Sequence, residues 1–169
     1  MRSLSPARVV FWTAGAVTFA ADQLTKWLIY ERILETRDVT IVPGFFYLKA
    51  SQNTGVVWGL FGRWPAAVGL MGLGAAGLVV FFYYRHAGRS RLEGLAWGII
   101  LGGAAGNLLD RAFLGHVRDF LDLTVAGFSW PTFNVADGCI SVGAVYLILS
   151  YAFARHEEPS ESGKVPKKW

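Results

Sequence analysis

Two aspartates, Asp119 and Asp137, have the residue type and setting to do chemistry together. If folding brings their carboxyl groups close, both cannot easily ionise, so the pKa of one rises while that of the other falls. The charged carboxylate can then take a proton from water, while the protonated one donates to a carbonyl oxygen. Asp110 and Asp122 lie in the same stretch and are alternative members. Such a pair would hydrolyse a peptide bond without a metal or a nucleophilic side chain.

Other polar residues occur at helical spacing inside or beside apolar segments. Asp22 and Lys26 are four residues apart, and so are Asn107 and Arg111. Residues four apart share one face of a helix, and ionisable groups in an apolar segment are costly and usually functional. For Asp22 and Lys26 a purely structural ion pair is the alternative interpretation.

The residues just before Asp137 predict the start of a helix. Asn134 is a good N-cap, because its side chain can accept a backbone N–H of the first turn. Asp137 would then lie in that first turn, where the helix dipole favours a negative charge. This explains the placement of Asp137 without assigning it a function.

Metal and cofactor chemistry is not indicated by the sequence. Cys139 is the only cysteine, and the three histidines (His86, His116 and His156) are scattered. None has the spacing of a zinc site. We therefore expect no metal and no cofactor. The net charge of +4 does not indicate nucleic-acid binding, because the basic residues flank apolar runs.

The composition is that of a membrane protein. Of 169 residues, 53% are hydrophobic and only 17% are charged, against about a quarter in average soluble domains. A helix needs about 20 residues to cross the hydrocarbon. Four runs meet this length, at about 9–30, 64–84, 92–109 and 137–154. We expect an α-helical polytopic protein with a single membrane domain over 1–155 and a disordered cytoplasmic tail over 156–169.

Basic residues predict the orientation of these spans. Nine of the 16 Lys and Arg lie in the N-terminal segment, the link between the second and third runs, and the tail. Those segments should be cytoplasmic, so both termini are expected inside and loops 31–63 and 110–136 outside. A signal peptide cleaved after Ala20 is a second interpretation of the N-terminus.

The outer loops and the glycines carry further structural predictions. The β-prone segments 39–42 and 45–48, with a Pro43-Gly44 turn between them, and residues 56–58 predict a small sheet on the membrane surface. A short amphipathic helix is expected near 111–121, followed by a turn at Gly127. Glycines repeat every four residues in the third run and predict close helix packing; they are Gly98, Gly102 and Gly106.

Five segments in chain order resemble the motifs of the lipoprotein signal peptidases (signal peptidase II). Asp22-Gln23-Leu24-Thr25-Lys26 resembles D-Q-x-x-K, and Asn53-Thr54-Gly55 begins a segment similar to N-x-G-A-A-F-S. Residues 102–111 resemble G-G-A-x-G-N-x-x-D-R, residues 117–120 resemble V-x-D-F, and residues 133–137 resemble F-N-x-A-D. The chain departs from the second motif at Val56, Val57, Trp58 and Gly59, which bears on the shape of the substrate cleft.

The resemblance implies an aspartic endopeptidase of the bacterial inner membrane, with Asp119 and Asp137 as the catalytic pair. It implies supporting or substrate-binding roles for eight residues: Asp22, Lys26, Asn53, Gly55, Asn107, Arg111, Asn134 and Ala136. The implied substrate is a diacylglyceryl-modified prolipoprotein, cut on the amino side of the lipidated cysteine near the extracytoplasmic face. Membrane lipids and a globomycin-type inhibitor are the other expected ligands, and Arg111 would meet either a lipid phosphate or the substrate backbone.

Two other classes of function compete with this interpretation. A proton-coupled membrane carrier would use intramembrane carboxylates, with Asp22, Lys26 and Asp137 as relay groups, and predicts polar residues through the bilayer midplane. A non-catalytic assembly factor would not need two carboxylates flanked by asparagines. The second apolar run has no charge, and the polar residues gather toward one side of the membrane. Both features favour the peptidase.

Overall fold

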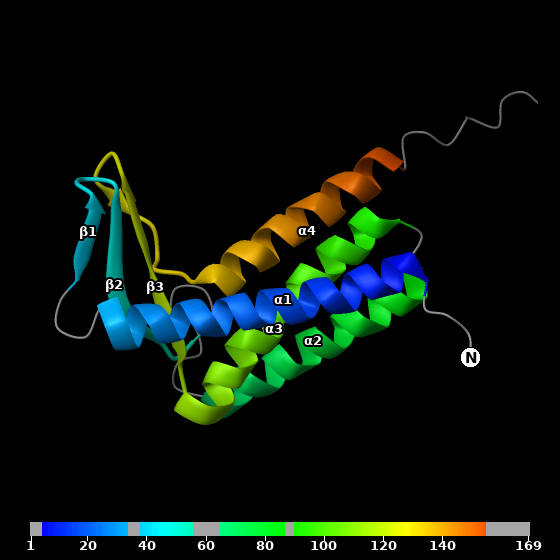
Figure 1. The fold of residues 1–169 in the computed structure, drawn as a ribbon, viewed down its shortest axis with the longest axis horizontal. Coiled ribbons are helices and arrows are strands. Elements are labelled where there is room, and N and C mark those ends of the chain that lie inside the picture. The colour runs from blue at the N-terminus through cyan, green and yellow to red at the C-terminus, as the bar shows by residue number, and fades with distance from the viewer. Residues whose placement is uncertain (1–4, 34–37, 56–64, 87–89, 155–169) are drawn as a thin grey trace, which may run out of the picture.

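A computed structural model describes residues 5–33, 38–55, 65–86 and 90–154. The long helices run along the longest axis of the molecule, and a small sheet lies at one end of them (Figure 1). The helices are α1 (Pro6–Leu28), α2 (Pro65–His86), α3 (Arg91–Leu114) and α4 (Val135–Ala154), and a π-helical turn, η1 (Ile29–Ile33), follows α1. Each helix covers one of the four predicted apolar runs. The predicted tail lies outside the described residues.

Three of the described helices are long and apolar enough to cross a membrane: α2, α3 and α4. Large apolar side chains on their surfaces are exposed, as at Leu70, Ile148 and Phe153. The helix α1 has 23 residues but buries Thr18, Asp22 and Lys26. It continues without a break through residues 18–21, where the alternative interpretation places a cleavage site.

The helix α3 continues five residues beyond its predicted end, so a separate helix near 111–121 was a wrong prediction. Residues 111–114 form the last turn of α3, and Gly115 ends it in the left-handed conformation with φ 77°. The strand β3 (Val117–Val125) then begins. Its backbone groups are paired with a strand from the other loop, a tertiary interaction that outweighs local helical periodicity.

The sheet is antiparallel, in the order β1 (Val39–Val42), β2 (Phe46–Asn53), β3 and β4 (Phe128–Ser129). The turns at Pro43-Gly44 and Gly127 are confirmed, because both glycines have positive φ. The third predicted strand, at 56–58, lies outside the described residues. Because β2 pairs with β3, the segment between α1 and α2 and the segment between α3 and α4 contribute to one sheet.

Glycines bring α1 and α3 into close contact, as the four-residue repeat predicted. Three glycines of α3 lie against backbone carbonyls of α1, and a fourth, Gly106, lies against the Asp22 carboxylate. A Cβ at any of them would meet these atoms; the three pairs are Gly94–Ala7, Gly98–Phe11 and Gly102–Gly15. This contact brings the polar ends of α1 and α3 together.

Candidate active site

Lys26 is fully buried at the centre of a polar cluster between α1 and α3. Its Nζ lies 2.8 Å from Asp22 Oδ2, 3.2 Å from Asp110 Oδ2 and 2.9 Å from Asn107 Oδ1. The three protons of the ammonium therefore have three oxygen acceptors. The predicted Asp22–Lys26 ion pair is present, and it extends to two residues of α3.

Arg118 and Gln23 complete this cluster, and the sequence did not single them out as site residues. Arg118 Nη2 lies 2.7 Å from Asp110 Oδ1, and its backbone N–H donates to Asp110 Oδ2 at 3.0 Å. Gln23 Oε1 accepts from Arg118 Nη2 at 3.0 Å. Two cations thus balance the two carboxylates Asp22 and Asp110. The signal that could have identified Gln23 and Arg118 was their position within the D-Q-x-x-K and V-x-D-F segments.

The other carboxylates considered as catalytic alternatives are engaged in ion pairs. Asp110 is bound by Lys26 and Arg118. Asp122 Oδ2 lies 2.8 Å from Lys49 Nζ. Among the four aspartates of residues 110–137, the other two, Asp119 and Asp137, accept hydrogen bonds from neutral N–H donors.

Asp119 projects from β3 and is 1% exposed. Its Oδ1 accepts from Asn134 Nδ2 at 2.6 Å, and its Oδ2 accepts from Asn53 Nδ2 at 3.0 Å. Burial, and then the nearby charge of Asp137, raise the pKa of the Asp119 carboxyl from 3.8 to about 6. Asp119 therefore retains a proton at a much higher pH than an ordinary aspartate.

Asp137 lies in the first turn of α4, where N–H groups surround its carboxylate. Asn107 Nδ2 donates to Asp137 Oδ1 at 2.8 Å, and the backbone N–H of Asn134 donates to Oδ2 at 3.2 Å. Asn134 Oδ1 accepts the backbone N–H of Asp137 at 3.0 Å, so the predicted N-cap is present. Each carboxyl oxygen of Asp137 therefore accepts an N–H donor.

Two asparagines connect the buried lysine to both aspartates. Asn107 Oδ1 accepts from Lys26 Nζ and, at 3.0 Å, from Asn134 Nδ2. Because its oxygen faces these donors, the amide nitrogen of Asn107 faces Asp137. Asn134 Nδ2 also donates to Asp119. The orientation of each amide therefore follows from the position of the lysine ammonium.

The remaining predicted residues join the same cluster. Arg111 Nη2 donates to the Gly55 carbonyl at 2.7 Å, and the Gly55 N–H donates to Asn53 Oδ1 at 3.0 Å. The N–H of Ala136 donates to Asp22 Oδ1 at 3.1 Å. All ten residues proposed from the sequence thus lie in one connected network at the sheet end of the helices.

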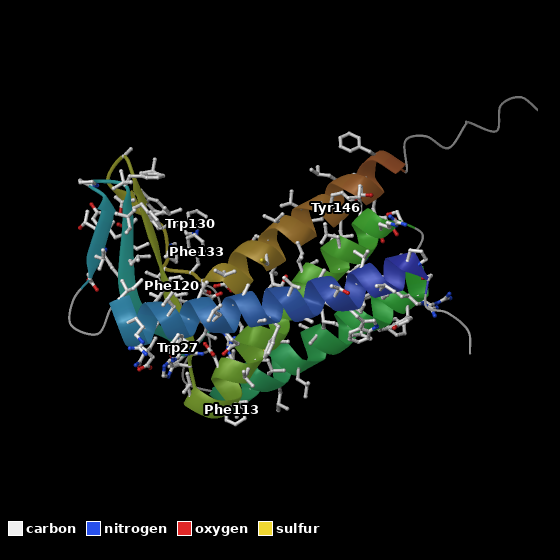
Figure 2. The ribbon with its side chains drawn as sticks, in the orientation of Figure 1. Trp27, Phe113, Phe120, Trp130, Phe133 and Tyr146 are labelled. Carbon is white, nitrogen blue, oxygen red and sulfur yellow. The ribbon has the colours of Figure 1, made fainter. Side chains whose placement is uncertain are left out.

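A cavity of about 570 Å³ opens beside this network. Its polar lining includes Asn53, Arg111 and Asp137, and most of its surface is apolar, with Trp130, Phe133, Ile140 and Val142 in the lining. Figure 2 shows Trp130 and Phe133 between the sheet and the start of α4. Among the described residues Asp119 is not part of the lining, but Asn53 both lines the cavity and binds Asp119.

This arrangement provides one buried carboxyl with a pKa raised to about 6 and a second carboxyl that accepts N–H donors at a helix start. No group of three or more His, Cys, Asp or Glu in the described ranges is placed to hold a metal ion. The site is chemically equipped for acid–base hydrolysis of a peptide bond at an apolar cavity.

Comparisons with known proteins agree with this chemistry. Residues 14–153 match the family model of signal peptidase II. The lipoprotein signal peptidase of Solibacter usitatus is 40% identical over 142 residues, covering 80% of this chain and 85% of the relative. That of Bacillus subtilis is 32% identical over 141 residues, covering 83% and 92%.

Two solved structures of bacterial membrane enzymes share the fold. One has a TM-score of 0.77 and 24% identity, and covers 93% of this chain and 92% of its own. The other has a TM-score of 0.72 and 26% identity, and covers 82% and 90%.

Proposed function

The chain belongs to the signal peptidase II family, and from that membership we infer that it is an aspartic endopeptidase that removes signal peptides from prolipoproteins. We propose that Asp119 and Asp137 are its catalytic pair. The observation that carries this assignment is the contrast between the two carboxyls. Asp119 is buried and has a pKa raised to about 6, whereas Asp137 receives N–H donors at a helix start.

The contrast assigns a role to each aspartate. Asp137 takes a proton from water as the water oxygen attacks the scissile carbonyl carbon, and Asp119 gives its proton to the carbonyl oxygen. The product is a tetrahedral diol. As the C–N bond breaks, Asp137 passes its proton to the leaving nitrogen, and Asp119 recovers one from a diol hydroxyl. Both carboxyls return to their starting states.

The lining of the cavity supports the proposal of a lipid-modified substrate. Its apolar lining includes Trp130 and Val142, which are 56% and 65% exposed, so the cavity adjoins the apolar surface of α4. We propose that the substrate cysteine carries a diacylglyceryl group, that cleavage occurs on its amino side, and that membrane lipids and a globomycin-type cyclic peptide also bind here. Arg111 reaches the cavity and meets a lipid phosphate or the substrate backbone.

We propose that α1 is a fourth span and that the site lies at the extracytoplasmic face of the bacterial inner membrane. The length of α1 supports this, as do Arg85 and Arg91 at the helix ends away from the sheet. Both termini are then cytoplasmic. In a Cys139→Ala background, a membrane-impermeant maleimide should label Ser129→Cys and not Ser90→Cys in intact spheroplasts. The reverse labelling pattern would show that the topology is opposite to the one proposed.

The carrier hypothesis has no support from the comparisons. The structure adds that Asp22 and Lys26, two of its three relay candidates, have fixed partners at short distance.

Single substitutions test the catalytic pair. Asp119→Asn and Asp137→Asn should each abolish cleavage of a diacylglyceryl-modified prolipoprotein by purified enzyme, with insertion into the membrane retained. Asp122→Asn is the matched control, because Asp122 lies on the same strand and pairs with Lys49; it should cleave at a rate near wild type. Globomycin should block the wild type. Turnover near wild type in either pair variant would remove that residue from the pair.

A further inference from the structure

The strand β2 has an irregularity directly beside Asp119. Leu48 pairs with Leu121, and the next pair is Ser51 with Asp119. Three steps along β2 therefore correspond to two steps along β3, so β2 carries one extra residue. A bulge of this kind interrupts the ladder of backbone hydrogen bonds and leaves backbone groups without strand partners.

The hydroxyl of Tyr30 occupies this interruption. It accepts the backbone N–H of Ser51 at 3.0 Å. Its oxygen also lies 2.6 Å from the Ser51 carbonyl oxygen and 2.8 Å from the Asp119 carbonyl oxygen. A hydroxyl has one proton, so Tyr30 donates to one of these carbonyls at a time. Both acceptors flank the bulge, and one belongs to the residue that carries the Asp119 carboxyl.

The chain brings Tyr30 to this point through the π-helical turn η1 at the end of α1. Short π-helical segments occur often at functional sites, because the wider turn redirects a side chain. The Tyr30 ring packs against the buried cluster of Leu48 and Phe120 under the sheet. Packing therefore holds the ring, and the ring holds the hydroxyl against the bulge. Lys26 lies on α1, just before this turn.

We propose that Tyr30 is a positioning residue, which fixes the backbone of Asp119 relative to α1 and so aligns the Asp119 carboxyl with Asn134 and Asn53. This inference rests on the catalytic role of Asp119 given above. The carboxyl needs both amide contacts, at 2.6 and 3.0 Å, and β3 must be held in place for both to form. Displacing a catalytic group by about 1 Å can cost about 100-fold in rate.

The test is Tyr30→Phe, which removes the hydroxyl and keeps the packed ring. Its matched control is Tyr47→Phe, because the Tyr47 hydroxyl also accepts a backbone N–H in this sheet, that of Gly44 at 2.7 Å. Steady-state kinetics with a diacylglyceryl-modified prolipoprotein should show kcat at least about tenfold lower for Tyr30→Phe at unchanged KM. The kcat of Tyr47→Phe should stay within twofold of wild type.

Amide hydrogen exchange gives a second readout on the same proteins. The β2 peptide that contains Ser51 should exchange faster in Tyr30→Phe than in wild type, because the Ser51 N–H loses its acceptor, and Tyr47→Phe should leave it unchanged. The proposal is overturned if both variants lower kcat equally, if only KM changes, or if exchange in β2 is unaffected. Asp119→Asn separates the two ideas, because an active Asp119→Asn enzyme refutes the catalytic pair whatever Tyr30→Phe does.

Discussion

Asn134 and Asp137 bind each other in both directions across the first turn of α4. Asn134 Oδ1 accepts the Asp137 N–H at 3.0 Å, and Asp137 Oδ2 accepts the Asn134 N–H at 3.2 Å. This reciprocal pair is a capping box. The Asn134 amide nitrogen also binds Asp119, so one residue both starts the helix and contacts the two aspartates.

Substitutions of Asn134 should separate its capping role from its site role. Serine is a good N-cap but has no amide to donate to Asp119, whereas alanine provides neither function. We expect Asn134→Ser and Asn134→Ala both to lower kcat at least about tenfold. Only Asn134→Ala should also lose about 1 kcal/mol of stability, measured by thermal unfolding in detergent. Wild-type kcat in Asn134→Ser would show that the amide contact with Asp119 is dispensable.

The raised pKa of Asp119 predicts a pH-dependent cost to stability. Below pH 3.8 the carboxyl is protonated in both the folded and unfolded protein, and as pH rises through about 6 the folded protein must ionise it against burial. The shift corresponds to up to about 3 kcal/mol of stability, present at low pH and lost by pH 7. Asp119→Asn removes this dependence, so its melting temperature relative to wild type should rise between pH 4 and pH 7. A melting-temperature difference that stays constant with pH would mean that ionising Asp119 does not destabilise the folded protein.

The same pKa should limit activity on the alkaline side. Asp119 acts as the acid, so kcat/KM for prolipoprotein cleavage should fall about tenfold per pH unit above about pH 6. Asp122→Asn should show the same alkaline limb, because Asp122 is paired with Lys49. A flat profile between pH 6 and 8 would contradict the acid role of Asp119.

Burial should decide how much each of two ion pairs of equal length contributes to stability. Lys26–Asp22 and Lys49–Asp122 both measure 2.8 Å, but the Lys26 side chain is 0% exposed and that of Lys49 is 39% exposed. Lys26→Met leaves the buried Asp22 carboxylate without its cation, and should destabilise the protein by about 3–5 kcal/mol. Lys49→Met should cost about 1 kcal/mol or less. Thermal unfolding in one detergent compares the two, and equal losses would contradict this ordering.

Helix spacing should matter at Gly103 and not at Gly77. A Cβ at Gly103 would lie 2.7 Å from the Ala136 carbonyl oxygen, whereas a Cβ at Gly77 meets nothing within 4 Å. Gly103→Ala should push α4 from α3, lengthen the Asn107–Asp137 contact and lower kcat at least about tenfold. Gly77→Ala should be neutral or slightly stabilising, because alanine favours the helix. Equal effects on kcat would show that this contact does not set the site.

The sequence by itself determined the apolar helices, the close-packing glycines of α3, the Asp22–Lys26 pair and the cap at Asn134. Each follows from local periodicity or from spacing along one helix, which the covalent chain imposes. The motifs also supplied ten residues of the network, but they did not single out Gln23 and Arg118. The tertiary structure alone decided that residues 117–125 form a strand, because their partner in β2 lies about 70 residues away along the chain. It likewise decided the contacts of Tyr30 and Arg118, since a hydrogen bond between distant segments depends on how the helices and sheet pack.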